Sequence, residues 1–200
     1  MIEIEKFNAL NYDIRKRYLD LSRKTKKWEK GYVNDKDDLG GETIDGISRK
    51  NFPDSKIWSI VDNYKKSTEA LTSLEKGTQA YNKQIYSLSI GNVQYKQLMH
   101  AFYYFNFWSE LGCGDIKEDI NAMALFDLSV NSGIRRAINL SFDVLKKDGN
   151  LVFLINEYGE EFCNKLCEER KKFLERIIAK RPVLVKFRNG WLNRVNDFIV

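Results

Sequence analysis

Apolar side chains recur every three or four residues along most of this chain, which is the spacing of one buried helix face. The first run predicts a single helix over residues 3–29. Its inner face would carry Phe7, Leu10, Ile14, Tyr18 and Leu21. Later runs of the same spacing predict helices over residues 55–74, from 115 to about 130, from 134 to near 149, from 162 to before Pro182, and over 183–199. The pattern therefore predicts a mainly helical protein.

Two segments interrupt this helical spacing. Residues 32–50 hold a Gly-Gly pair and several aspartates, so we expect a loop there with a small β-hairpin. Residues 75–92 are polar without a clear period, and we expect a hinge there. The hinge would divide the chain into regions 1–92 and 93–200. We expect these regions to pack into one compact unit, although 200 residues suffice either for one domain with a sizeable core or for two small domains packed together.

An aromatic run begins soon after the expected hinge. Residues 101–108 read A-F-Y-Y-F-N-F-W and are apolar on nearly every side, which is typical of a helix that is buried all round. His100, the one histidine, stands beside this run, so we expect it to pack among aromatic rings. Trp191, near the end of the chain, is expected to anchor the core, although a platform on which a sugar ring stacks is the alternative.

Composition and charge narrow the possible partners. The 33 basic and 28 acidic side chains give a net charge of +5, which suits an acidic polymer but also serves solubility alone. We expect no nucleic-acid partner, because the basic clusters at residues 24–27 and 170–172 lie in helical segments laced with glutamate. No run of about 18 apolar residues occurs, so we expect no membrane insertion. Residues 1–20 are charged throughout and hold no apolar core segment, so we expect no signal peptide.

The cysteines and the histidine predict neither a disulfide framework nor a metal site. Cys113, Cys163 and Cys167 are odd in number, and the last two would share one helix face as small apolar side chains. Zinc would need more histidines or a C-x-x-C pair, and the chain has neither. We therefore expect no metal and no organic cofactor.

Candidate chemistry lies in residues 28–48, which read W-E-K-G-Y-V-N-D-K-D-D-L-G-G-E-T-I-D-G-I-S. Glu29 stands where a charged helix should end. Cleavage of a glycosidic bond needs an acid for the leaving oxygen, and a carboxylate or a held water on the other face of the sugar. Glu29 would be the acid, Asp38 a second carboxylate, and Thr43 could hold a water through its hydroxyl. Acidic loops are more often simply solvated, so this pattern also fits an ordinary surface loop.

The same segment resembles the signature of the N-acetylmuramidases of glycoside hydrolase family 108, which include phage endolysins and proteins labelled secretion activators. That signature is roughly E-G-G-Y-x-N-D-P-x-D-P-G-G-x-T-x-x-G-I-T. The chain matches it at Glu29, Gly31, Tyr32, Asn34, Asp35, Asp38, Gly40, Gly41, Thr43, Gly46 and Ile47. It departs at Lys30, Lys36, Leu39 and Ser48. Residues 107–133, with F-W near the start and F-D-L-S-V-N-S-G at the end, and G-W-L-N-R-V at 190–195 are similar to later parts of the family in the same order.

The resemblance implies a mainly helical, lysozyme-like fold with a small β-hairpin beside the active-site cleft. Residues 1–92 would form the catalytic region, and residues 93–200 a helical region described in the family as predicted to bind peptidoglycan. Glu29 would be the proton donor, with Asp38 and Thr43 as its catalytic partners. The expected substrate-binding residues are Tyr32, Asn34, Asp35, Asp45 and Asn131, although Asn131 also fits a plain helix junction.

The implied activity is hydrolysis of peptidoglycan between N-acetylmuramic acid and N-acetylglucosamine, so glycan strands of the cell wall are the expected partner. The resemblance also implies synthesis in a bacterial or phage-infected cytoplasm, from which a chain without a signal peptide would reach the wall through a pore-forming holin. Lys30 and the missing prolines also suit a second hypothesis, a non-catalytic wall-binding or secretion-assisting protein that keeps the fold. Exchange of Glu29 for glutamine distinguishes the two hypotheses.

Overall fold

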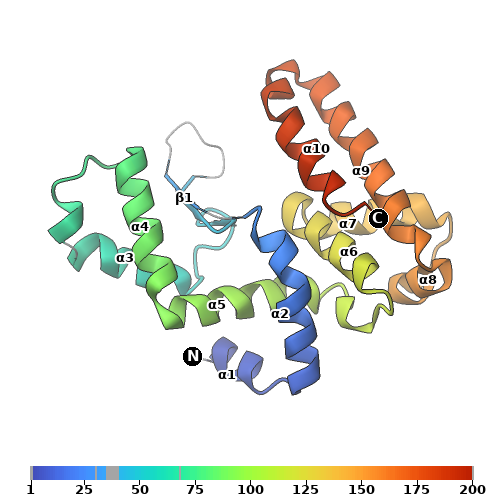
Figure 1. The fold of residues 1–200 in the computed structure, drawn as a ribbon, viewed down its shortest axis with the longest axis horizontal. Coiled ribbons are helices and arrows are strands. Elements are labelled where there is room, and N and C mark those ends of the chain that lie inside the picture. Colours follow the sequence, from blue (N-terminus) through green and yellow to red (C-terminus); the bar gives the residue numbers. More distant parts are fainter. Residues whose placement is uncertain (1, 30, 35–40, 68, 200) are drawn as a thin grey trace. The chain divides into compact units, whose positions relative to one another are not determined.

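The computed structural model describes residues 2–29, 31–34, 41–67 and 69–199 (Figure 1). Packing divides the chain into two compact units. The first unit comprises Met1–Asn11 and Lys26–Tyr104, and the second comprises Tyr12–Thr25 and Phe105–Val200. Ten α-helices and one small sheet occur among the described residues, which confirms the prediction of a mainly helical chain with a small β element.

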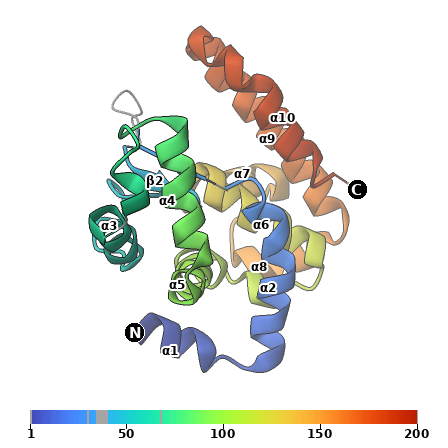
Figure 2. The ribbon, with the colours of Figure 1, turned by 60° about the vertical axis from the view of Figure 1, so that its left-hand side comes forward.

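The first unit consists of the sheet and four helices within its described part (Figure 2). The helices are α1 (Ile2–Asn8), α3 (Ile57–Ser67), α4 (Gln79–Gly91) and α5 (Val93–Tyr103), with a 3-10 turn at Glu69–Leu71. Helices α3, α4 and α5 pack against one another, and α1 packs against α5. Ile57, Ile85 and Tyr95 are fully buried between them, so each of these three helices contributes to the core of the unit.

The sheet is antiparallel, in the order β1 (Tyr32–Val33), β2 (Thr43–Ile44), β3 (Ile47–Ser48). Ile44 pairs with Ile47 across a two-residue turn. Asp45 and Gly46 form this turn with φ values of 45° and 74°. Positive φ at both positions is what a tight hairpin requires, and an Asp-Gly pair adopts it more readily than other residues. The predicted hairpin is therefore confirmed, and β1 adds a third strand to it.

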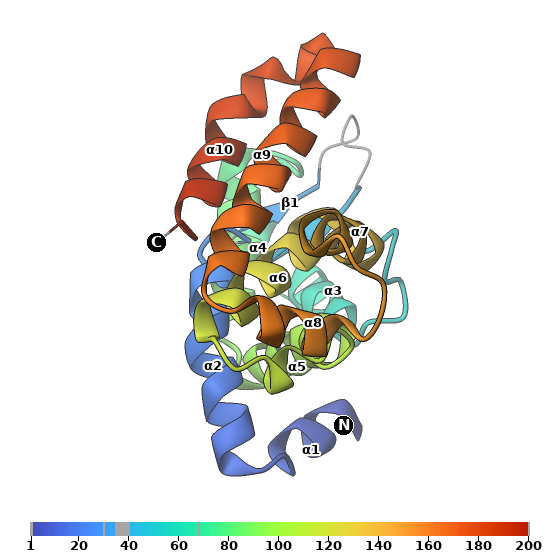
Figure 3. The ribbon, with the colours of Figure 1, turned by 90° about the vertical axis from the view of Figure 1, so that its right-hand side faces the viewer.

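The second unit is helical in its described part (Figure 3). It contains α2 (Tyr12–Lys26) except for its last residue, and a π-helical turn (Tyr104–Trp108) except for its first residue. A 3-10 turn (Cys113–Asp115), α6 (Asp119–Ser132), α7 (Ile134–Leu145), α8 (Leu151–Tyr158), α9 (Glu161–Lys180), a 3-10 segment (Pro182–Phe187) and α10 (Arg188–Asn196) complete the unit. Tyr18, Trp108 and Phe126 meet edge to face at the centre, with ring centroids 5.5–6.2 Å apart. Such contacts stabilise a core beyond the area that they bury.

A buried ionic group ties three helices of the second unit together. The Asp127 carboxylate on α6 is fully enclosed and accepts hydrogen bonds from Arg170 Nη1 at 2.6 Å and from Arg194 Nη2 at 2.8 Å. Arg170 lies on α9 and Arg194 on α10. Two guanidinium groups on one carboxylate compensate the desolvation of all three charges, so this group holds α6, α9 and α10 in register.

The helix predicted over residues 3–29 is wrong in its continuity. It is divided into α1 and α2 by an interruption at residues 9–11, and α2 ends at Lys26. Asparagine at position 11, directly before α2, favours the start of a new helix over the interior of an old one. Phe7 and Tyr18, which the pattern places on one face, accordingly belong to different units.

The hinge predicted over residues 75–92 is also wrong, because α4 occupies most of it. Thr78 begins that helix by accepting a hydrogen bond from the Tyr81 amide at 3.3 Å. The buried stripe of α4 is only Tyr81, Ile85 and Ser89, so its period is hidden by the polar residues around it. The two compact units divide the chain elsewhere than at residue 92, and the functional regions 1–92 and 93–200 stay a prediction.

Every helix in the described part of the chain is too short or too polar to cross a bilayer. The same residues bring together no group of three His, Cys, Asp or Glu side chains that could hold a metal ion.

Candidate active site

Glu29 lies one turn beyond the last residue of α2, in the first unit. Its amide donates to the Lys26 carbonyl at 3.3 Å, so the chain continues to curl after the helix has ended. The side chain is half-buried. The carboxyl group therefore lies on a short, backbone-bonded segment just after the end of a helix, where the sequence pattern places it.

The Glu29 carboxyl group rests on the backbone of the β2–β3 turn. A methyl group built on Gly46 would lie 2.3 Å from Glu29 Oε2 and 2.8 Å from Tyr103 Oη. Both separations are far below van der Waals contact, so a side chain at position 46 cannot coexist with this placement of Glu29. Gly46 is thus required twice, once for its φ of +74° and once for the space that the carboxyl group occupies.

Asp45, the other residue of that turn, makes hydrogen bonds through its carboxylate, its carbonyl oxygen and its amide. Its carboxylate accepts a hydrogen bond from Tyr95 Oη at 2.7 Å and another from Tyr86. Its carbonyl oxygen accepts from Tyr103, and its amide donates to the Gly31 carbonyl at 2.8 Å. The side chain is only 7% exposed. Helices α4 and α5 therefore hold the turn from above through tyrosine hydroxyls.

The pKa shifts of Asp45, Tyr86 and Tyr95 are consistent with the hydrogen bonds between them. Burial raises the pKa of Asp45, and the two tyrosine hydrogen bonds oppose that rise. Burial and the nearby Asp45 charge raise the pKa values of Tyr86 and Tyr95 well above the usual range. Both phenols therefore stay protonated and remain hydrogen-bond donors at any physiological pH.

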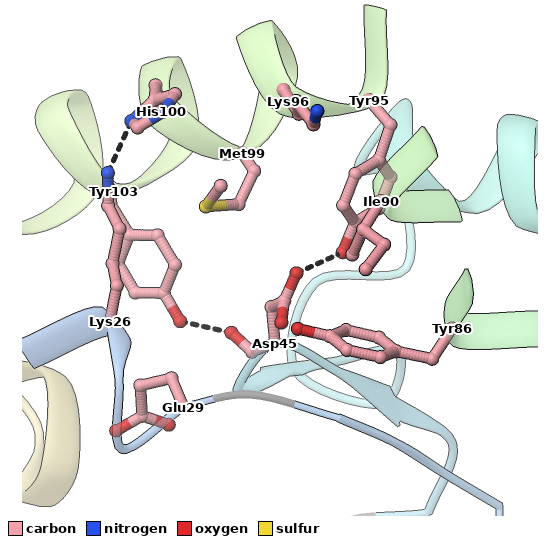
Figure 4. A pocket seen from close by; sticks show the side chains of 10 residues that line it. All are labelled: Lys26, Glu29, Asp45, Tyr86, Ile90, Tyr95, Lys96, Met99, His100 and Tyr103. Carbon is pink, nitrogen blue, oxygen red and sulfur yellow. Dashed lines mark hydrogen bonds between the residues drawn. The ribbon is translucent and has the colours of Figure 1, made fainter. Parts of the chain in front are cut away.

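A pocket of about 290 Å³ lies beside these groups in the first unit (Figure 4). Its lining residues are Lys26, Glu29, Asp45, Tyr86, Ile90, Tyr95, Lys96, Met99, His100 and Tyr103. Glu29 and Asp45 approach from the α2 end and the hairpin, whereas the other side chains, apart from Lys26, come from α4 and α5 (Figure 4). The pocket therefore combines a carboxylic acid with tyrosine rings and apolar walls, an arrangement suited to holding a sugar and donating a proton to it.

His100 is packed in the pocket wall, as predicted. Its ring stacks against Phe7 with centroids 6.4 Å apart, and Lys26 donates a hydrogen bond to His100 Nδ1. Burial, helped by the Lys26 charge, lowers the pKa of His100 to about 3. The imidazole is therefore neutral at physiological pH and serves to hold Lys26.

The other predicted site residues of the first unit lie on the sheet or beside it. Thr43 is on β2, half-buried, and its hydroxyl donates to the Gly41 carbonyl at 3.2 Å. Tyr32 on β1 is 4% exposed and donates to Glu42 at 3.0 Å, so it packs the sheet and does not line the pocket. Asn34 is exposed at the end of β1. Asp35 and Asp38 lie outside the described residues.

Asn131 belongs to the second unit, near the end of α6. Its amide oxygen accepts a hydrogen bond from Arg170 Nη2 at 3.0 Å, and Gly133, with a φ of 86°, ends the helix. This contact fits the interpretation of the segment as a helix junction. Its assignment to substrate stays a prediction.

Sequence reasoning missed the helical wall of the pocket. Tyr95, Met99 and Tyr103 stand four residues apart, on one face of α5. That spacing was available in the sequence, but it is indistinguishable from an ordinary core stripe. Only the position of the Asp-Gly turn relative to α5 shows that these side chains serve the region around Glu29.

Comparison with known proteins agrees with this reading. The sequence model of the family described as Glycosyl hydrolase 108 matches residues 22–133, which include Glu29, the sheet, α3 to α5 and all of α6. The structure described as that of Brucella abortus SagA is similar in fold, with a TM-score of 0.55, 19% identity and 90% of each chain covered. No curated protein matches the chain. Because the family match spans more than half of its residues, this chain belongs to glycosyl hydrolase family 108.

Proposed function

We propose that this protein hydrolyses peptidoglycan as a lysozyme-like muramidase, cleaving between N-acetylmuramic acid and N-acetylglucosamine with Glu29 as the general acid. The observation that carries the proposal is the close approach of the Glu29 carboxyl group to Gly46, at the wall of a pocket lined by tyrosine rings and apolar side chains. A general acid must hold one position while the leaving oxygen departs, and backbone contact supplies that constraint.

In this proposal Glu29 protonates the glycosidic oxygen of the departing sugar. The positive charge that develops on the other sugar needs a carboxylate or an activated water on the opposite face. Asp38 and Thr43 are proposed for these roles on the grounds of sequence. Asp45 is proposed to act indirectly, because its carboxylate is already engaged by Tyr86 and Tyr95. It positions the turn against which Glu29 lies.

The partners and place of action follow as part of the same proposal. The substrate would be the glycan strands of the bacterial wall, and neither a metal nor an organic cofactor is proposed. The protein would be made in the cytoplasm and reach the wall through a pore such as a holin. Glycosyl hydrolase family membership supports the reaction class. The bond cleaved is proposed from the resemblance of residues 28–48 to the signature of the family's muramidases, and Glu29 is proposed as the acid from its place in the pocket wall.

The test is digestion of purified peptidoglycan by the protein and by Glu29→Gln, with soluble products read by mass spectrometry. We expect fragments that end in reducing N-acetylmuramic acid from the protein and none from the variant. Glu75→Gln, an exposed carboxyl of the same unit, is the matched control and should leave activity unchanged. Equal activity of Glu29→Gln would remove Glu29 as the acid. Binding to the wall without fragments from either protein would favour the non-catalytic hypothesis instead.

A further inference from the structure

The turn between α9 and α10 in the second unit carries large apolar side chains in contact with solvent. Val183 is 70% exposed, Val185 58% and Phe187 46%. All three belong to the 3-10 segment Pro182–Phe187, which begins two residues after the last residue of α9. We call residues 180–188 the basic tip. In the three ribbon views the tip lies at the far end of the paired helices α9 and α10, beyond α6, α7 and α8 of the same unit (Figures 1, 2 and 3).

Basic residues surround these apolar side chains. Residues 176–196 contain six lysines and arginines and no acidic residue. This excess exceeds the net charge of +5 of the whole chain, so the positive charge of the protein is concentrated there. A charge so localised acts on an extended anionic surface much more strongly than the same charge spread over the molecule.

Three of these charges remain available at the tip. Arg194 is buried against Asp127, and Arg188 pairs with Glu175 at 2.6 Å. Lys180, Arg181 and Lys186 are exposed, and no ion pair engages them within the described residues. Lys186 lies over the Phe187 ring, with Nζ 5.0 Å from its centroid, and Phe187 in turn stacks on Trp191. Apolar and basic groups thus alternate on one exposed turn.

We propose that the basic tip docks onto the surface of an anionic lipid bilayer. Lys180, Arg181 and Lys186 would meet lipid phosphates, while Val183, Val185 and Phe187 would enter the boundary between headgroups and acyl chains. A soluble polyanion could satisfy the bases but would leave the apolar side chains in water. The alternation of both kinds of group within one turn therefore favours a bilayer over a polysaccharide or a nucleic acid.

The experiment is cosedimentation of the full chain with phosphatidylcholine vesicles, with and without one quarter phosphatidylglycerol. We expect binding to the anionic vesicles only, weakened strongly as salt is raised from about 50 mM to about 500 mM. Each of Lys180→Gln and Lys186→Gln should lower the partition coefficient about fivefold. The double variant Val183→Ser/Val185→Ser should lower it about tenfold at unchanged charge, since two exposed isopropyl groups lose their apolar environment.

Matched controls separate the tip from general surface effects. Val93→Ser changes a valine that is also 70% exposed, and Lys83→Gln changes an exposed lysine, both in the first unit. Both controls should bind vesicles as the unaltered protein does. Equal binding to neutral and anionic vesicles would overturn the proposal. Loss of binding in the lysine variants without loss in Val183→Ser/Val185→Ser would indicate a polyanion site and would also overturn it. So would a dimer in solution that dissociates in the valine variant, because the tip would then be covered by a second copy.

Discussion

The contact between Glu29 and Gly46 makes Gly46→Ala the sharpest perturbation of the proposed acid. The added methyl group would lie 2.3 Å from Glu29 Oε2, whereas ordinary contact begins near 3.4 Å. The carboxyl group must therefore move by about 1 Å, because the turn is held by three tyrosines and cannot yield easily. A displacement of that size in a catalytic group can lower the rate about a hundredfold, and we expect a loss of that order here.

The same substitution has a backbone cost that must be separated from the catalytic effect. Alanine at a φ of +74° destabilises the fold by about 1–2 kcal/mol, whatever surrounds it. Gly77→Ala supplies the control, because Gly77 has a φ of +87° and its nearest neighbour would be the Asn34 carbonyl oxygen at 3.9 Å. Both variants should lose similar stability in urea unfolding, but only Gly46→Ala should lose the initial rate of peptidoglycan solubilisation. A folded Gly46→Ala variant with a rate within threefold of the unaltered protein would refute the reasoning.

Three further perturbations test the surroundings of the site and the buried ionic group of the second unit. Asp45→Ala should cost about 2–4 kcal/mol of unfolding free energy, because it leaves the Tyr95 hydroxyl without its acceptor and places alanine at a φ of 45°. Asp45→Asn, which tolerates that φ and can still accept a hydrogen bond, should cost less than half as much by urea titration. The pKa of His100 is lowered from 6.5 to about 3, so its neutral form contributes stability that is present above pH 6.5 and is lost as pH falls toward 3. Between about pH 7.5 and pH 5 this loss should be about 2 kcal/mol, and His100→Gln should abolish that part of the pH dependence. Asp127→Ala leaves Arg170 and Arg194 buried without a carboxylate and should lower the free energy of unfolding by about 3–5 kcal/mol in thermal or urea unfolding. Asp54→Ala, at an exposed position, is the control. A smaller loss for Asp127→Ala than for Asp54→Ala would contradict the role given to the buried ionic group.

Much of the helical framework could be predicted, because long amphipathic helices repeat their apolar side chains every three or four residues. The helices α6, α7 and α9 lie within a few residues of their predicted bounds, and Gly133 and Pro182 mark real ends. The short helices were harder. In α4 the buried stripe holds one isoleucine, one tyrosine and one serine, so its pattern is too weak to distinguish from a polar linker. Burial against α3 and α5 selects the helix there, and that information is tertiary.

The candidate site shows the same limit from the functional side. The sequence indicates Glu29 because a helix end, a glycine and an acidic loop coincide there, and the structure places that carboxyl group in a pocket wall. It could not indicate that Asp45 is occupied by tyrosines, since Tyr86 and Tyr95 lie 41 and 50 residues away along the chain. The sequence alone does not distinguish an exposed aspartate that faces substrate from a buried aspartate that positions a neighbour. Their difference arises from desolvation and hydrogen bonding, which exist only after folding.

The Asp-Gly pair at positions 45 and 46 serves both the hairpin and the placement of Glu29. A hairpin of this length needs left-handed backbone at both residues, and that requirement alone would explain the pair. The hairpin requirement does not explain two other observations. The Glu29 carboxyl group occupies the space of the missing Gly46 side chain, and three tyrosine hydroxyls converge on Asp45. A turn that served only the hairpin would need neither. The turn is therefore best understood as a rigid platform, held from α4 and α5, whose function is to fix the position of Glu29.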